Sequence, residues 1–144
     1  MSDGDALLSA ILASPEEDVP RLVYADWLDE VGGESDRARA DLIRVQIALA
    51  RASSTDRPLD LEASEKRLLA TYRTSWLAPF QAEGGPLRGH AAHGQFHRGF
   101  VETVWLPATW FVARAEQLFA CVPARELRVM HTTIEELAAL VASA

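Results

Sequence analysis

The C-terminal third of the chain has a strand–helix–strand–helix pattern, which constrains the fold more than any other feature. Residues 100–106, FVETVWL, combine β-branched and aromatic residues between Gly99 and Pro107, as strands do. Apolar residues at helical spacing follow, and ARELRVM at 124–130 then alternates as a second strand. Because a helix joins the two strands, they are expected to lie side by side in parallel. The pattern predicts a small parallel sheet made of two βα units.

The N-terminal half is predicted to form four helices. Asp18, Ser35 and Asp60 are the expected N-caps of the second, third and fourth helices. SPEE at 14–17 has the form of a capping box, but Pro20 cannot lie inside a regular helix, which favours the later start. The expected buried stripe of the second helix consists of Val23, Tyr24, Trp27, Leu28 and Val31.

The spacing of the two βα units matches that of a known repeat. Val104 in the first strand and Leu127 in the second are 23 residues apart, and a leucine-rich repeat has about 20–29 residues. Two such units do not make a stable solenoid, which needs at least about three. We therefore expect the helical half to act as the terminal cap of a repeat array does.

A glycine-rich segment separates the helices from the predicted sheet. Pro79 is expected to close the fourth helix, and four glycines in residues 81–95 favour a loop. We predict an α-rich α+β fold in one compact domain. It has a helical cap region at 1–80, a loop at 81–95 and a leucine-rich-repeat-like βαβα region at 96–144.

Several motifs resemble one bacterial family. They are DALLSAILASPEEDVPRLVYADWLDE, DLIRVQIALAR, FHRGFVETVWL and LFACVPARELRV. Together they closely resemble the repeat-companion domain, which is found beside leucine-rich repeats. The resemblance implies that the C-terminal strands look like the first rungs of a repeat array, and it implies no particular reaction.

The charge of the chain is acidic and unevenly distributed. The net charge is −7, and residues 1–80 carry 15 acidic and 9 basic residues, against 6 and 5 in residues 81–144. This surface would repel a phosphate backbone or an anionic bilayer, so nucleic-acid and membrane binding are disfavoured. The single cysteine, Cys121, excludes an internal disulfide and fits a reducing cytoplasm. We expect its side chain to be a small buried apolar group rather than a nucleophile.

Three histidines form the best candidate for a metal site. His90, His93 and His97 have the spacing H-x2-H-x3-H, and imidazoles this close could meet at one zinc or nickel ion. No carboxylate or cysteine lies within the cluster as a fourth ligand, so a solvated glycine-rich loop is the competing interpretation. The corresponding alternative function is a small metal-dependent or hydrolytic enzyme that uses this loop.

The carboxylates of YADWLDE are a second chemical candidate. Paired carboxylates such as Asp26 and Asp29 or Glu30 can share acid–base chemistry when one lies in an apolar pocket. Here they fall outside the apolar stripe, which favours a solvated face, and Asp26 is expected to pair with an arginine such as Arg44. No P-loop, GxGxxG, GxSxG or HExxH motif occurs, and we expect no cofactor.

The predicted sheet offers a binding face. If Val104, Leu106, Leu127 and Val129 point inward, then the outward residues are Thr103, Trp105, Arg128 and Met130. Tryptophan beside arginine and methionine is typical of a binding hot spot, although the loop 81–95 or a dimer contact could cover Trp105. The sequence thus indicates a non-enzymatic protein–protein interaction module, which binds a protein partner or a second copy through the sheet face or edge.

Overall fold

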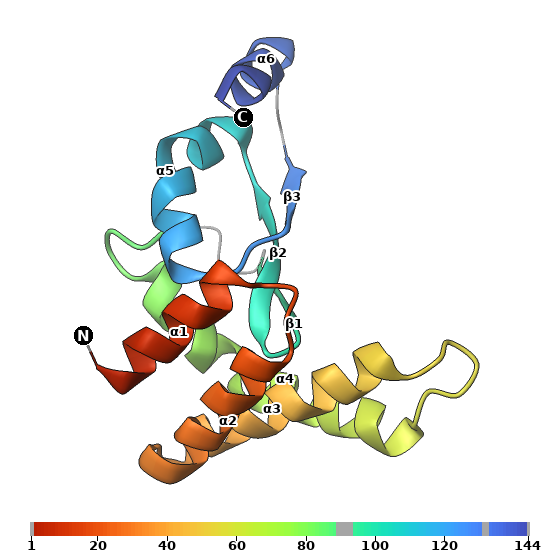
Figure 1. Ribbon diagram of the computed structural model, residues 1–144. Coiled ribbons are helices and arrows are strands. Elements are labelled where there is room, and N and C mark those ends of the chain that lie inside the picture. Colours follow the sequence, from red (N-terminus) through yellow and green to blue (C-terminus); the bar gives the residue numbers. More distant parts are fainter. Residues whose placement is uncertain (1, 89–93, 131–132, 144) are drawn as a thin grey trace. The chain divides into compact units, whose positions relative to one another are not determined.

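The computed structural model describes residues 2–88, 94–130 and 133–143 (Figure 1). Its elements are α1 (Asp3–Ala13), α2 (Val19–Val31), α3 (Glu34–Arg51), α4 (Leu59–Gln81), β1 (Gly94–His97), β2 (Phe100–Leu106), α5 (Ala108–Cys121), β3 (Glu126–Val129) and α6 (Ile134–Ser143). Most described residues are helical, and the strands form one small mixed sheet. The predicted α-rich α+β class is confirmed at this level.

The chain divides into two compact units, and each is described by itself. The helical unit comprises Met1–Trp76 and His97–Phe100, and the sheet unit comprises Leu77–Phe96 and Val101–Ala144. The predicted ranges 1–80, 81–95 and 96–144 stay a prediction of domain organisation. The elements differ from them in detail, because α4 ends at Gln81 and β1 begins at Gly94.

The helix starts follow local hydrogen bonding. α1 begins directly after Ser2, because the Ser2 hydroxyl accepts the N–H of Asp5 while the Asp5 carboxylate accepts the N–H of Ser2. The hydrogen bonds that the Ser2 N–H and hydroxyl donate to the Asp5 carboxylate hold the pKa of Asp5 below its usual value. α2 begins after Asp18 as predicted, but the Asp18 carboxylate does not cap the helix and instead accepts from Arg51 and Arg98.

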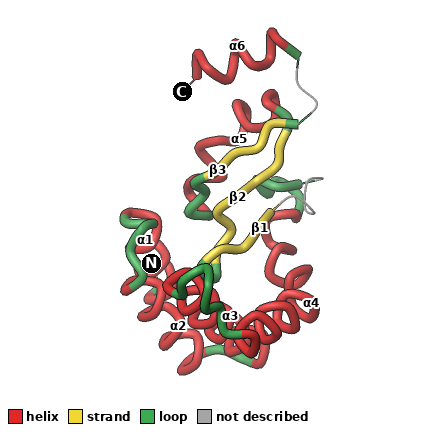
Figure 2. Tube along the Cα trace, turned by 90° about the vertical axis from the view of Figure 1, so that its right-hand side faces the viewer, coloured by secondary structure: helices red, strands yellow, loops and turns green. Residues whose placement is uncertain are grey.

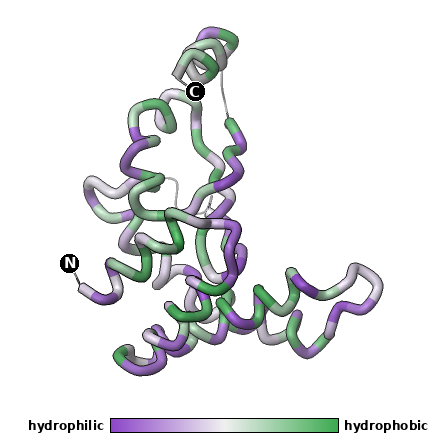
Figure 3. The backbone as a smooth tube through the Cα atoms, viewed as in Figure 1, coloured by the Kyte–Doolittle hydropathy of each residue, from purple (hydrophilic) through white to green (hydrophobic). Residues whose placement is uncertain are grey.

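The buried side of α2 differs from the predicted stripe. Of the predicted residues, Leu28 is buried, and Tyr24 and Trp27 are partly buried against the core. Val23 and Val31 are instead 45% and 61% exposed. Arg21 and Ala25 are buried in their place. The residues 21, 25 and 28 also recur at helical spacing, so the pattern alone did not distinguish the two stripes. α3 alternates between hydrophobic and hydrophilic residues (Figure 3), and its buried apolar residues include Leu42, Ile43 and Ile47. Together with Phe100, Ile43 and Ile47 belong to the core of the helical unit.

A two-residue turn joins β1 to β2 and belongs to the helical unit. Arg98 and Gly99 have φ values of 47° and 82°, as a type I′ hairpin turn requires. A Cβ atom at position 99 would overlap Ile43, so only glycine fits there. Gly99 also donates its N–H to Gln46 Oε1 over 2.7 Å and accepts from Arg39 Nε over 2.6 Å.

Buried guanidinium groups hold this turn. Arg21 is fully buried and donates to the carbonyls of His97, Arg98 and Pro15, at 3.2 Å, 3.3 Å and 2.5 Å. Arg98 in turn donates to the carbonyls of Pro15 and Glu16, at 3.0 Å and 2.8 Å. Backbone carbonyls buried in this way need donors, and arginine supplies several from one side chain.

In the sheet unit the strand order is β1–β2–β3, and β2 pairs with β3 in parallel (Figure 2). The register places Thr103 opposite Glu126, Val104 opposite Leu127, Trp105 opposite Arg128 and Leu106 opposite Val129. Arg125 donates its N–H to the Glu102 carbonyl at 2.7 Å, and Met130 donates to Leu106 at 3.1 Å. The predicted parallel pair is confirmed.

Two predicted boundaries are wrong. The expected loop 81–95 includes Gly94 and Gln95, which belong to β1. α4 continues through Pro79, which was expected to end it. Proline removes the donor to the carbonyl four residues earlier, Ser75, but both residues are exposed and water can hydrate that carbonyl.

α5 lies beside the sheet (Figure 1), and two of its side chains donate hydrogen bonds to the segment 84–86. Leu118 is buried, as are Val104 and Leu106 of β2. Trp110 donates its indole N–H to the Pro86 carbonyl at 3.1 Å, and Gln117 donates to Gly84. Part of the segment predicted as a glycine-rich loop is therefore held by specific donors. No helix among the described ranges is long and apolar enough to cross a bilayer.

Candidate functional site

The residues predicted to bind a partner lie on one face of the sheet. Thr103 and Trp105 alternate along β2 with Val104 and Leu106, which are both fully buried. On β3 the alternation continues, with Glu126 and Arg128 exposed and Leu127 and Val129 partly buried. We call Thr103, Trp105, Glu126, Arg128 and Met130 the outer face.

Neighbouring strands link the outer-face side chains to each other. The Arg128 guanidinium carbon lies 5.1 Å from the centroid of the Trp105 ring, and Arg128 Nε is 2.7 Å from Glu126 Oε1. Thr103 Oγ1 is 3.4 Å from Glu126 Oε2. Trp105 and Met130 are partly buried, whereas the Arg128 side chain is 54% exposed. The parallel register therefore brings an aromatic ring, a cation and an anion into one ordered cluster.

Glu126 is the outer-face residue that the predicted site omitted. The alternation of ARELRVM already placed it on the same side as Arg128 and Met130, but hot-spot composition favours tryptophan and arginine over glutamate. Its role depends on the register, because Glu126 lies opposite Thr103 and two residues from Arg128. That register could not be read from either strand alone.

The opposite side of β3 borders a small hollow in the sheet unit. The hollow has a volume of about 90 Å³ and is lined by Val104, Phe111, Leu118, Phe119, Ala124, Arg125, Glu126 and Leu127. It is much smaller than the roughly 300–1,000 Å³ of small-molecule sites. Phe111 and Phe119 meet edge to face at 6.0 Å, and Phe119 is 50% exposed. The hollow is therefore too small for a typical small-molecule ligand.

The predicted metal site falls largely outside the described residues. His90 and His93 lie in the segment 89–93, of which the structure describes nothing, and His97 is exposed on β1. Within residues 2–88, 94–130 and 133–143, no group of three metal-ligating side chains comes together. Cys121 is partly buried rather than fully buried at the end of α5.

The acidic face of α2 forms the predicted ion pair. Arg44 Nη2 lies 2.8 Å from Asp26 Oδ1 and 2.7 Å from Asp29 Oδ2. The predicted Asp26–Arg44 pair is therefore confirmed, with Asp29 as a second partner. Both carboxylates are engaged by one guanidinium, which favours a structural role in joining α2 to α3 over acid–base chemistry.

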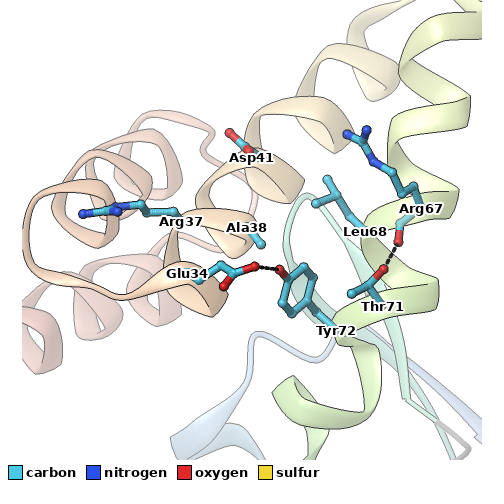
Figure 4. A pocket seen from close by; sticks show the side chains of 8 residues that line it. All are labelled: Glu34, Arg37, Ala38, Asp41, Arg67, Leu68, Thr71 and Tyr72. Atoms are coloured by element: carbon cyan, nitrogen blue, oxygen red, sulfur yellow. Dashed lines mark hydrogen bonds between the residues drawn. The ribbon is translucent and has the colours of Figure 1, made fainter.

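A groove with a volume of about 590 Å³ lies between α3 and α4 in the helical unit. We call it the α3–α4 groove, and it is lined by Glu34, Arg37, Ala38, Asp41, Arg67, Leu68, Thr71 and Tyr72. Glu34 and Tyr72 face each other across it (Figure 4), with the phenol donating to Glu34 over 3.1 Å. The Thr71 hydroxyl donates to the Arg67 carbonyl over 2.9 Å.

The α3–α4 groove contains no activated nucleophile. The hydrogen bond to Glu34 raises the pKa of the Tyr72 phenol, so the phenol stays neutral at physiological pH. Thr71 uses its hydroxyl within its own helix. The groove is thus a surface of mixed charge, lined by arginine, carboxylate and hydroxyl side chains.

Comparison with known proteins gives no relative of this chain. No protein-family model matches the sequence, no curated protein is similar to it, and no solved structure matches the fold.

Proposed function

We propose that this chain is a non-enzymatic protein-interaction module that binds a protein partner through the outer face. The carrying observation is the pair formed by Trp105 and Arg128, which lie opposite each other in the register with 5.1 Å between guanidinium and ring. Tryptophan and arginine are the residues that most often dominate binding energy at protein interfaces. Thr103 and Met130 complete the face that the partner contacts.

The contacts that hold the Arg128 side chain in place on the outer face support this function. Glu126 and the Trp105 ring hold the Arg128 guanidinium on two sides before any partner arrives. A side chain that is already ordered loses less conformational entropy on binding, so more of the contact energy appears as affinity. An exposed arginine with no such support would give a weaker site.

We further propose that the sheet unit continues the pattern of a leucine-rich-repeat array and that the helical unit acts as its cap. The register pairs Val104 with Leu127, 23 residues apart, and an α-helix connects their parallel strands. The resemblance to the bacterial repeat-companion domain supports the same assignment, and the lone Cys121 supports a reducing cytoplasm. β1 departs from a solenoid, because its two-residue turn makes it antiparallel to β2.

The test is a truncation of the central aromatic residue. The partner is first isolated by co-purification from the native cell and mass spectrometry, and is then prepared in pure form. Trp105→Ala is expected to weaken its binding by about 30-fold or more in isothermal titration, as hot-spot truncations do. Phe119→Ala removes an exposed aromatic residue from α5 and is the matched control, with an expected change of less than about threefold. Equal affinities of wild type and Trp105→Ala would exclude this site.

A further inference from the structure

β3 has one side with no neighbouring strand among the described residues, since the sheet order is β1–β2–β3. Met130 donates its N–H to the Leu106 carbonyl of β2. Successive residues of an extended strand direct their backbone groups to opposite sides, so the backbone groups of Glu126 and Arg128 also face β2. Arg125, which donates its N–H to Glu102 of β2, precedes β3 and is outside this alternation. Leu127 and Val129 therefore direct their N–H and C=O groups to the open side. Such an edge accepts a further strand by main-chain hydrogen bonding.

The side chains of β3 determine which strand fits that edge. Glu126, Leu127 and Arg128 carry opposite charges on either side of an apolar residue. If two copies pair antiparallel around Leu127, the Glu126 of each copy lies opposite the Arg128 of the other. Parallel pairing in register would instead place Glu126 beside Glu126. The charge pattern is therefore complementary to itself only in the antiparallel arrangement.

The directions of the backbone N–H and C=O groups of β3 favour the same antiparallel arrangement. Leu127 directs its backbone groups to the open edge, so two Leu127 residues would exchange both N–H···O bonds at the two-fold axis. Glu126 and Arg128 then occupy the non-hydrogen-bonded positions, where opposing side chains lie closest. The backbone and the charges thus select one register.

We propose that the β3 edge pairs with β3 of a second copy of this chain, antiparallel and centred on Leu127, to give one continuous sheet across a two-fold symmetric dimer. This inference rests on the proposed function, because it names the chemistry of a partner for the same sheet. The Leu127 side chains lie on the inner side, next to the apolar hollow bordered by Phe111 and Phe119. The outer face of each copy, including Trp105, continues into that of the other.

The test exchanges the two charges. Sedimentation velocity of the full chain, over a roughly hundredfold range of concentration, is expected to show a monomer–dimer equilibrium for the wild type. Glu126→Arg places like charges opposite each other twice in the symmetric interface, and so does Arg128→Glu. Each single variant is expected to raise the dimer dissociation constant by about tenfold or more. The double exchange E126R/R128E restores opposite charges, and its dissociation constant is expected to return to within about threefold of the wild type.

Each outcome decides the inference. A wild-type chain that stays monomeric overturns it, as does a double exchange that dissociates like the single variants. Circular dichroism checks that the variants fold, and the two single variants substitute for each other if one does not. A monomer that still binds its partner through Trp105 would overturn the dimer and leave the proposed function standing. A charge-exchangeable dimer whose Trp105→Ala variant binds the purified partner normally would support the dimer and exclude the partner site.

Discussion

At two positions along β2 an arginine side chain lies over an aromatic ring, and the two sites differ in burial. At the first residue of the strand, Arg21 and Arg39 lie 5.4 Å and 5.0 Å from the Phe100 centroid. Near its end, Arg128 lies 5.1 Å from the Trp105 centroid. The cation–π geometry is alike, yet Arg21 is fully buried while the Arg128 side chain is 54% exposed.

The difference is in what the guanidinium groups bind. Arg21 and Arg39 donate to main-chain carbonyls of the turn 97–99, so they are committed to the fold. Burial lowers the pKa of Arg39 to about 10, which still leaves the group charged at neutral pH. Arg128 touches only side chains in its described contacts, Glu126 and Trp105. The same pair is therefore structural at one site and available to a partner at the other.

The largest expected effect comes from removing the buried cation. Arg21→Met deletes the guanidinium donors to the carbonyls of His97 and Arg98 and removes a side chain that is fully buried. The free energy of unfolding of the helical unit is expected to fall by about 3 kcal/mol or more. Denaturant melts combined with peptide-resolved hydrogen exchange measure this loss.

Arg37→Met is the matched control for Arg21→Met, because Arg37 is exposed in the same unit. Its expected effect is below about 0.5 kcal/mol. Equal losses in the two variants would contradict a structural role for the buried group.

Gly99→Ala tests whether the turn held by these arginines tolerates a side chain. The added Cβ would overlap Ile43 at a φ of 82°, and the expected loss of stability is about 2–4 kcal/mol. Gly84→Ala separates the two causes, since Gly84 has a φ of 80° with open space around it. It should cost only about 1 kcal/mol in a thermal melt. A Gly99→Ala variant no worse than Gly84→Ala would show that the overlap is relieved at little cost.

Arg128→Ala tests how much the exposed arginine at Trp105 contributes to stability. Its contacts with Glu126 and the Trp105 ring are open to solvent, so its expected effect on unfolding free energy is below about 1 kcal/mol. A double-mutant cycle with Trp105→Ala measures the coupling between cation and ring. If Arg128→Ala lowered the free energy of unfolding as much as Arg21→Met does, the two sites would not differ in their structural role.

The smallest expected effect concerns the two tyrosines of the chain. Burial raises the pKa of Tyr24, and the hydrogen bond to Glu34 raises that of Tyr72, so absorbance at 295 nm should titrate above pH 10. Because the Tyr72 pKa is raised on folding, its contribution to stability is complete below pH 10 and is lost as pH rises through the folded pKa. Glu34→Gln is expected to lower only the Tyr72 step. An unchanged titration would mean that the Glu34–Tyr72 hydrogen bond is absent in solution.

The sequence predicted those features that depend on local pattern. Alternation and the intervening helix predicted the parallel pairing of β2 and β3, and their spacing agrees with the register of Val104 and Leu127. The charge and helical position of Asp26 predicted its pairing with Arg44. In each case the partners are close along the chain or on consecutive elements.

Features that depend on distant partners were missed. Arg21 lies 77 residues from Arg98, and a charged residue on a helix is ordinarily expected in solvent. Its spacing to Ala25 and Leu28 was the available signal. Arg-Gly between Phe96 and Phe100 resembles a hairpin turn, and this signal could have identified β1 within the predicted loop.

The composition of β3 also bears on how the molecule avoids aggregation. An exposed strand edge can recruit unrelated strands and seed fibrils, most readily when it is long, flat and apolar. β3 has only four residues, and two of them are charged. A mismatched strand would place a like charge opposite Glu126 or Arg128, so growth into an extended fibril is disfavoured. Replacing both with valine would keep the main-chain donors and acceptors while removing this protection.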